Sequence, residues 1–519
     1  MLDLPALRAQ VYRIEPPLLP GDSIRMHCTS SYDAPAIELD LEFRNLVQNG
    51  LTLTHFSPTI GYETYRELQD EQERSKRGFP QLRPSPPLDP DNLTARRNHK
   101  NSTDSDLVTM ETIISTESDH VAIAPGTLLR SWNQQNRQYF HYRLDPPTPK
   151  APMVLSARLR VARDLCNGIT TEVWYHPDHK WNVPSMMHGL HSALNYGIQN
   201  FGPYQFSFAR IVEFPRYENH IAAMAFPGTM PYSEAGGFIT DIRSPGAFEK
   251  AFFIVAHEVA HQWWAYQVIG ANMEGAKMLS ETLAEYTAMM VLEREFGSEM
   301  VRRHLRVAHH NYLAGRALDT RNEHPLSRVR PDQSYLCYHK GSLVMYHLRQ
   351  LIGEEKINAA LRRLLKKFGG KGPPYATSTD LINEFKAETP AEHHAILDDL
   401  FNRIILFSNK ITRSDIRQLP AGRHQITLEI ECRKLESDEK GVEREVPFEQ
   451  DIEIGAFAAV DDHRKYGAAL YRQMHRLTSG RNTVVFETTE IPDTVAVDPF
   501  CMLIDRNIDD NVVSPTAEP

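Results

Sequence analysis

The residues with the clearest potential for chemistry lie in the run VAHEVAHQWW at positions 255–264. Two histidines, His257 and His261, are four positions apart, and Glu258 directly follows the first. In an α-helix, residues four apart lie on the same face one turn apart, so two imidazoles at this spacing can bind one zinc ion. Glu258 projects beside them, where a carboxylate can act on a water molecule at the metal. The pattern predicts a zinc site on a helix.

A catalytic zinc ion usually takes three protein ligands and a water molecule, so a third ligand is needed. Glu281 lies in the next helical run, MLSETLAEY, among apolar residues where an unpaired carboxylate would be costly. We therefore predict one zinc ion per chain, bound by His257, His261 and Glu281. Glu285, one turn further on, is predicted to orient a ligand histidine. For both glutamates the alternative is an ordinary charge on an exposed helix face.

Composition excludes several classes of protein. The 519 residues predict more than one domain, and the net charge of -10 with no basic patch argues against a nucleic-acid partner. Five cysteines lie far apart without a CxxC pair, which argues against a disulfide framework or a cysteine zinc site. Because no signal peptide and no long apolar run is present, we expect a soluble chain.

The patterning along the chain predicts an α+β multidomain protein with three parts. Residues 1–163 form a β-rich domain, in which alternating apolar and polar runs at 22–30, 107–116 and 137–145 predict strands. Within it, the charged and Pro-rich stretch 67–106 predicts a long loop or mobile insertion. Residues 164–408 are mostly helical in their spacing of apolar residues and contain the metal motif. Residues 409–519 predict a small β domain.

At the metal motif the sequence resembles the M1 family of zinc aminopeptidases (gluzincins), whose pattern is HExxH, eighteen residues and then a glutamate. Here nineteen residues, 262–280, separate His261 from Glu281, a departure of one residue in the connecting loop. HQWW at 261–264 and SETLAEY at 280–286 are similar to the family's HQWF-like and NE-x-x-A-x-Y segments. The resemblance implies a saddle-like N-terminal β-sheet domain and a thermolysin-like, mostly helical catalytic domain.

Two further segments are similar to family motifs and imply roles for two more residues. YHKG at 338–341 matches the family's Y-x-K-G, which implies that Tyr338 donates a hydrogen bond to the oxyanion, with Tyr335 as a neighbouring rival. Residues 228–240 are similar to the GAMEN exopeptidase motif and the strand after it, although the GAM part is not preserved. Counting back from the end of this segment places Glu234 on the motif's glutamate, which implies that it binds the substrate's free α-amine.

A closer resemblance exists to bacterial M1-like domains that are fused behind the permease segments of ABC-2-type transporters. It rests on features of that subgroup such as VEFPRY at 212–217, FPGTMPYSE at 226–234 and DPFCMLIDRNIDDN at 498–511. The resemblance implies a bacterial protein that is tethered to a membrane permease, with a natural chain that begins before Met1.

These observations predict a zinc metallopeptidase that removes N-terminal residues from peptide substrates. One alternative is a catalytically weak, peptidase-like domain that binds peptides for an associated transporter, which the altered motif at 228–240 favours. A second alternative is an endopeptidase on the same scaffold. A structural zinc site is least favoured, because such sites usually have four protein ligands and favour cysteine.

Overall fold

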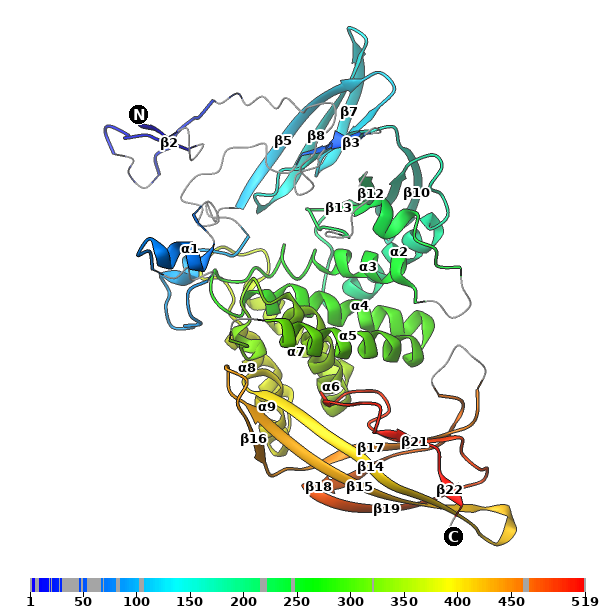
Figure 1. Ribbon diagram of the computed structural model, residues 1–519. Helices are drawn as coiled ribbons and strands as arrows, with labels where there is room; N and C mark the ends of the chain where they lie inside the picture. Colours follow the sequence, from blue (N-terminus) through cyan, green and yellow to red (C-terminus); the bar gives the residue numbers. More distant parts are fainter. Residues whose placement is uncertain are drawn as a thin grey trace.

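The computed structural model describes residues 2–4, 9–17, 19, 21–27, 29, 46–47, 50–53, 67–68, 70–80, 85–101, 107–214, 222–243, 248–319, 322–460 and 466–517. Sheets come first along the chain, helices follow, and sheets return at the end, so that the helical part lies between two β parts (Figure 1). The predicted α+β multidomain fold is confirmed.

The N-terminal part is built of antiparallel sheets. Its longest strands pair in the order β5 (Leu107–Glu117), β8 (Arg137–Pro149) and β7 (Thr127–Gln134). A second sheet has the order β3 (Leu46–Val47), β4 (Gly50–Leu53), β9 (Val154–Ala157) and β6 (Val121–Ile123), and β1 (Leu2–Leu4) pairs with β2 (Ala9–Val11). The runs predicted at 107–116 and 137–145 are strands, whereas residues 22–27 of the run predicted at 22–30 form none.

A mixed four-stranded sheet joins this part to the helices. Its order is β10 (Arg160–Cys166), β11 (Ile169–Tyr175), β12 (Phe208–Phe214) and β13 (Thr229–Ser233). The strands β11, β12 and β13 run parallel, with α2 (Val183–Asn200) in the crossover between β11 and β12. Every residue of β12 is buried, as expected for a parallel strand that is covered on both faces.

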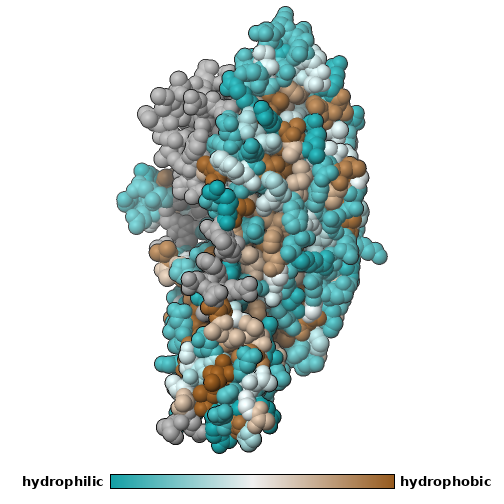
Figure 2. Space-filling view, turned by 90° about the vertical axis from the view of Figure 1, so that its right-hand side faces the viewer, coloured by the Kyte–Doolittle hydropathy of each residue, from teal (hydrophilic) through white to brown (hydrophobic). Residues whose placement is uncertain are grey.

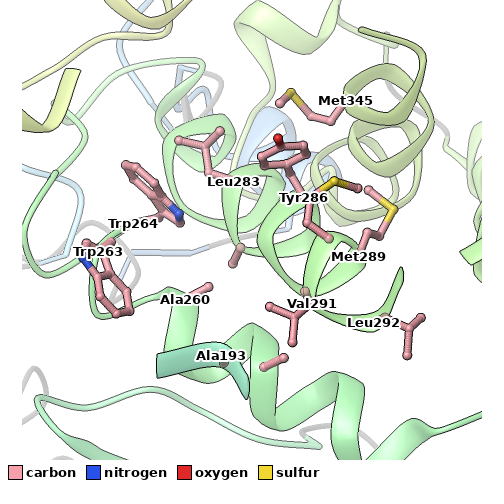
Figure 3. Packing of buried hydrophobic residues seen from close by; sticks show 14 of the residues in the cluster. Ala193, Ala260, Trp263, Trp264, Leu283, Tyr286, Met289, Val291, Leu292 and Met345 are labelled. Carbon is pink, nitrogen blue, oxygen red and sulfur yellow. The ribbon is translucent and has the colours of Figure 1, made fainter. Parts of the chain in front are cut away.

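The central part consists of helices packed around α3 and α4. In chain order these are α3 (Lys250–Ala260), α4 (Glu281–Phe296), α5 (Ser298–Leu318), α6 (Gly341–Ile352), α7 (Glu354–Phe368), α8 (Ser378–Glu388) and α9 (His394–Phe401). Trp263 and Trp264, just after α3, are fully buried and belong to the same core as Leu283 and Tyr286 of α4 (Figure 3). This apolar packing fixes the two helices that carry the predicted metal ligands.

The C-terminal part is formed by two sheets that share an apolar core. One contains β16 (Glu443–Val446), β15 (His424–Ser437), β14 (Ile404–Gln418) and β22 (Thr516–Ala517), with β19 (Gly480–Thr488) also paired to β15. The other contains β18 (Ala469–Thr478), β17 (Glu449–Phe457), β20 (Thr494–Val497) and β21 (Val512–Val513). Ile430 of the first sheet and Ile454 of the second are both fully buried in this core.

Both domain boundaries predicted from the sequence fall inside strands. The boundary after residue 163 divides β10, which pairs along its whole length with β11. The boundary after residue 408 divides β14, which begins at Ile404 shortly after α9 ends. Because a strand is held by its neighbours in one sheet, divisions before Arg160 and before Ile404 agree better with the structure.

The polar stretch 67–106 is mostly exposed where it is described, but a few of its side chains are buried. Asp70 caps the short helix α1 (Glu71–Lys76) by accepting a hydrogen bond from the N–H of Glu73. Further on, Arg96 and His99 are buried against the helical part. Apart from the short 3-10 turn η4 (Ala95–Arg97), residues 85–101 have the irregular backbone of the predicted loop, but this loop is anchored to the helical part. The segment is held chiefly by hydrogen bonds to buried polar groups, which leave little trace in a hydropathy pattern.

Within the described ranges, no helix is long and apolar enough to cross a membrane. The face of the molecule in Figure 2 is predominantly hydrophilic, with hydrophobic residues scattered among polar ones.

Candidate active site

The two histidines of the motif lie at the C-terminal end of α3. His257 is in its last turn, and His261 is the residue that caps it. Their rings are neighbours, with centroids 4.7 Å apart, as the four-residue spacing on a helix requires. Both side chains and that of Glu258 are buried. The sequence prediction of a common helix face for the two imidazoles therefore agrees with their positions.

Glu281 approaches the histidines from the first residue of α4. Its Oε2 lies 3.6 Å from Nε2 of His257 and 3.3 Å from Nε2 of His261. The nineteen connecting residues include the 3-10 turn η6 (Ala276–Leu279). Gly275, the residue before this turn, has a φ of 84°. A Cβ on Gly275 would lie 2.2 Å from the carbonyl oxygen of Ser327, so only glycine fits there. The nineteen-residue connection thus brings Glu281 to within 3.6 Å of both histidines.

The second nitrogen of each histidine has its own partner. Nδ1 of His257 lies 3.0 Å from Oε1 of Glu285, and Nδ1 of His261 lies 3.1 Å from the carbonyl oxygen of Trp264. These acceptors favour a proton on Nδ1 and leave a lone pair on each Nε2. Such partners are typical of metal-ligating histidines.

The donor set fits a zinc ion. Ligand atoms of His257, His261 and Glu281 all lie within 4.8 Å of one another. Two imidazole nitrogens and one carboxylate are a donor set of catalytic zinc, which keeps a position open for water or substrate. Although burial acts to raise it, the pKa of Glu281 is held well below its usual range by His261 and His257.

Glu258 and Tyr338 lie beside this set. Burial raises the pKa of Glu258 above its usual range. Tyr338 donates a hydrogen bond of 2.7 Å to Oε2 of Glu281, and its ring stacks against His257. The rival Tyr335 donates instead to Asp319, at 2.9 Å. Of the two tyrosines, Tyr338 is thus the one that reaches the predicted metal ligands.

Cys337, between the two tyrosines, is fully buried, and burial raises the pKa of its thiol to about 12. Because the reactive form of cysteine is the thiolate, we assign no nucleophilic role to Cys337.

A cavity of about 310 Å³ opens onto these residues. Its lining includes His257, His261, Glu281, Glu258 and Tyr338 at the motif and, away from it, Lys100, Asn101, Lys150, Ala223, Met224, Ala225 and Tyr266. The size suits part of a peptide, and the opening gives a substrate access to the predicted metal ligands.

Glu234 does not line this cavity. It begins the π-helical turn η5 (Glu234–Phe238) after β13, and its buried side chain points to another cluster. There Nδ1 of His179 lies 3.5 Å from Oε1 of Glu234 and 2.5 Å from Oε1 of Glu213. The shorter contact is a hydrogen bond, too close for two ligands held by one zinc ion at about 2.0–2.1 Å each. This cluster is therefore not a zinc site. Because Glu234 contacts His179 and does not line the cavity, we do not assign it to the substrate.

The cavity wall is formed instead by the segment that precedes β13. Residues 222–226 fold back along β13 through bridges Ala223–Tyr232 and Phe226–Thr229. This hairpin puts Ala223, Met224 and Ala225 on the cavity side. The run AAMAF at 222–226 carries no acidic residue, so this part of the wall offers no carboxylate to a substrate. Glu234, which the resemblance implies as the amine anchor, lies at the end of the second arm of the hairpin and outside the cavity lining.

Sequence reasoning also missed Lys100 and Asn101. Both come from the polar stretch 67–106, where lysine and asparagine ordinarily face solvent. Nothing in the local pattern distinguished them, because their position depends on the docking of residues 85–101.

Comparison with known proteins agrees with the site. Residues 187–402 match the peptidase family M1 domain, a range that includes all these motif residues. Leucine aminopeptidase 2 of Aspergillus terreus is 23% identical over 202 residues, which are 36% of this chain and 32% of that protein. The crystal structure of Legionella pneumophila aminopeptidase A in complex with aspartic acid superposes with a TM-score of 0.50 at 15% identity, covering 78% of this chain and 45% of the other.

The structural likeness, at this identity, concerns the fold alone. The chain spans about a third of the length of the curated relative and under half of the solved structure. The family match supports a peptidase function for the central part, over residues 187–402.

Proposed function

We propose that this protein is a zinc-dependent metallopeptidase of the M1 type that acts as an aminopeptidase on peptides. The observation that carries the proposal is the convergence of His257, His261 and Glu281 in a cavity that Glu258 and Tyr338 also line. A domain that only binds peptides needs no buried general base beside the metal ligands, whereas hydrolysis does.

Each of these residues would have a distinct role in peptide hydrolysis. His257, His261 and Glu281 would hold the zinc ion, which when bound supplies the Lewis acidity that activates water and polarises a carbonyl group. Glu258 would take a proton from the attacking water and deliver it to the leaving amine. Tyr338 would donate a hydrogen bond to the carbonyl oxygen as negative charge develops there. Glu285 and the carbonyl group of Trp264 keep the two imidazoles oriented.

The direct test compares peptide amides with a free and with an acetylated N-terminus on protein loaded with zinc. An aminopeptidase cleaves only the free forms. Equal cleavage of both forms would instead establish an endopeptidase, and no cleavage of either would contradict the proposed hydrolytic function.

An endopeptidase is the second candidate, and one observation favours it. Glu234, the residue that the resemblance implies as the amine anchor, lies outside the lining, and the wall at 223–225 carries no carboxylate. Without a carboxylate there, a free α-amine has no acidic anchor beyond Glu258 and Glu281 among the described lining residues.

We also infer from the subgroup resemblance that the natural protein is tethered to a bacterial membrane permease of the ABC-2 type. The support is the similarity of the segments at 212–217, 226–234 and 498–511 to that subgroup. Fractionation of cells that produce the full natural protein tests this, since recovery wholly outside the membrane fraction would contradict it.

A further inference from the structure

The stretch 85–101 is fastened to the helical part independently of the cavity. Arg96 donates hydrogen bonds to the carbonyl oxygens of Tyr375 and Pro90, at 2.9 and 2.8 Å, and forms an ion pair of 2.8 Å with Asp380. Backbone hydrogen bonds add to this, from Glu274 to Pro86 and from Asn272 to Asn98. The stretch would therefore stay docked without any contribution from the side chain of Lys100.

Lys100 extends from this docked stretch into the cavity. Its backbone N–H donates to the carbonyl oxygen of Gly270, which fixes the position of the side chain. Its Nζ donates a hydrogen bond to Oγ of Ser280, the residue before Glu281. In the part of the chain that the structure describes, no carboxylate lies within ion-pair distance of this ammonium group. A lysine ammonium has three donors, and a hydroxyl group satisfies only one of them.

The charges that line the cavity are unbalanced once a metal is bound. The acidic side chains of the described lining are Glu258 and Glu281, whose charges a divalent cation would offset. The ammonium group of Lys100 then leaves an excess of positive charge beside the metal site. A site that lies behind low-dielectric walls attracts ligands of opposite charge.

We propose that Lys100 anchors a carboxylate of the substrate beside the scissile bond, so that the site prefers anionic peptides. This inference rests on the proposed peptidase function and specifies its substrate class. The carboxylate has two possible sources, an acidic side chain or the C-terminal carboxylate of a short peptide. An ammonium–carboxylate hydrogen bond is among the stronger hydrogen bonds in proteins. The docked stretch 85–101 already holds the ammonium group of Lys100 at the cavity.

Two substrate pairs distinguish the sources. The first pair is Glu-Ala-Ala amide and Gln-Ala-Ala amide, which differ only in the side-chain charge. The second is Gln-Ala with a free C-terminus and its amide. Wild-type protein should favour the anionic member of one pair in kcat/KM by about tenfold, the worth of one charged hydrogen bond of about 1.4 kcal/mol.

Three variants separate recognition of the substrate from a structural role. Lys100→Gln should reduce the preference to about threefold or less, whereas Lys100→Arg should keep part of it because the charge remains. Lys277→Gln is the matched control, because Lys277 is a nearby lysine on η6 that does not line the cavity. It should keep the full preference. Equal losses for charged and neutral substrates in Lys100→Gln would overturn the proposal, since they would indicate a role in folding or in stabilising the transition state.

A binding measurement keeps the inference separate from hydrolysis. Calorimetric titration of the zinc-loaded Glu258→Gln variant with the same peptides should show the same preference, and adding Lys100→Gln should remove it. If wild-type protein cleaves none of the peptides, the proposed hydrolytic function is contradicted. The titration still tests whether the site prefers anionic peptides. Equal affinity for the charged and neutral members of both pairs overturns it.

Discussion

Glu285 lies directly behind His257, with its Oε1 3.0 Å from the imidazole Nδ1. Its other oxygen lies 3.1 Å from Nε2 of His304 and accepts a hydrogen bond of 3.1 Å from Ser342. Because its other oxygen is held by His304 and Ser342, Glu285 keeps a carboxylate oxygen next to the imidazole of His257. A ligand histidine that is oriented in advance binds its metal more tightly.

Glu285→Gln should weaken zinc binding by about 10–100-fold, because the amide holds the imidazole less firmly and lowers its basicity. Competition with a chromophoric chelator measures this affinity. The matched control is Glu295→Gln on the same helix, since Glu295 contacts His188 at the surface. An unchanged affinity in Glu285→Gln would contradict the orienting role.

Tyr338→Phe should lower kcat by about 10²–10³-fold with little change in KM, because the hydroxyl group is needed mainly in the transition state. The variant should keep its zinc. Tyr335→Phe is the control, since that hydroxyl group donates to Asp319 instead. A larger loss of kcat in Tyr335→Phe than in Tyr338→Phe would reverse the assignment of the two tyrosines.

Glu234→Gln should leave the ratio of cleavage between free and N-acetylated substrates unchanged, because Glu234 does not line the cavity. Ala225→Glu is the informative partner, since it adds a carboxylate to the wall and should raise the preference for free amines. The measurement is kcat/KM for both substrate forms. A selective loss of activity on free amines in Glu234→Gln would restore its role as the amine anchor.

Removal of the metal should lower stability, because zinc that binds only the folded state adds about 2.7 kcal/mol at a free concentration of 100 Kd. Thermal unfolding of chelated protein with and without added zinc measures this difference. His261→Ala should show a much smaller response, since one of three ligands is missing. An equal shift of Tm in His261→Ala would indicate that zinc stabilises the protein elsewhere.

The parts of the protein that periodic patterns or ligand chemistry specify could be predicted from the sequence. His257, Glu258 and His261 follow from helical periodicity alone, and Glu281 follows from the chemistry of an incomplete ligand set. The helical centre and the C-terminal sheets follow from hydropathy patterns, which record burial against an apolar core. Residue spacing in the sequence reflects the local geometry of helices and strands, which is why these features could be predicted.

The parts that depend on tertiary docking could not be predicted. Lys100 reaches the cavity because Arg96 fastens its segment to Tyr375 and Asp380, which are 279 and 284 positions away from Arg96 in the chain. Glu234 lies outside the lining because the hairpin at 222–233 puts its first arm, not its second, at the cavity. Polar contacts between distant segments carry no periodic signal, so only the three-dimensional structure reveals them.

Glu258→Gln tests the central claim most directly, through zinc content and turnover measured on the same samples. The amide has nearly the same shape but cannot accept the proton of the attacking water. We predict a folded variant with one zinc ion per chain and a kcat lowered by about 10²–10⁴-fold relative to wild type. Full activity in zinc-loaded Glu258→Gln, or wild-type protein that binds no zinc, would contradict the proposed zinc peptidase.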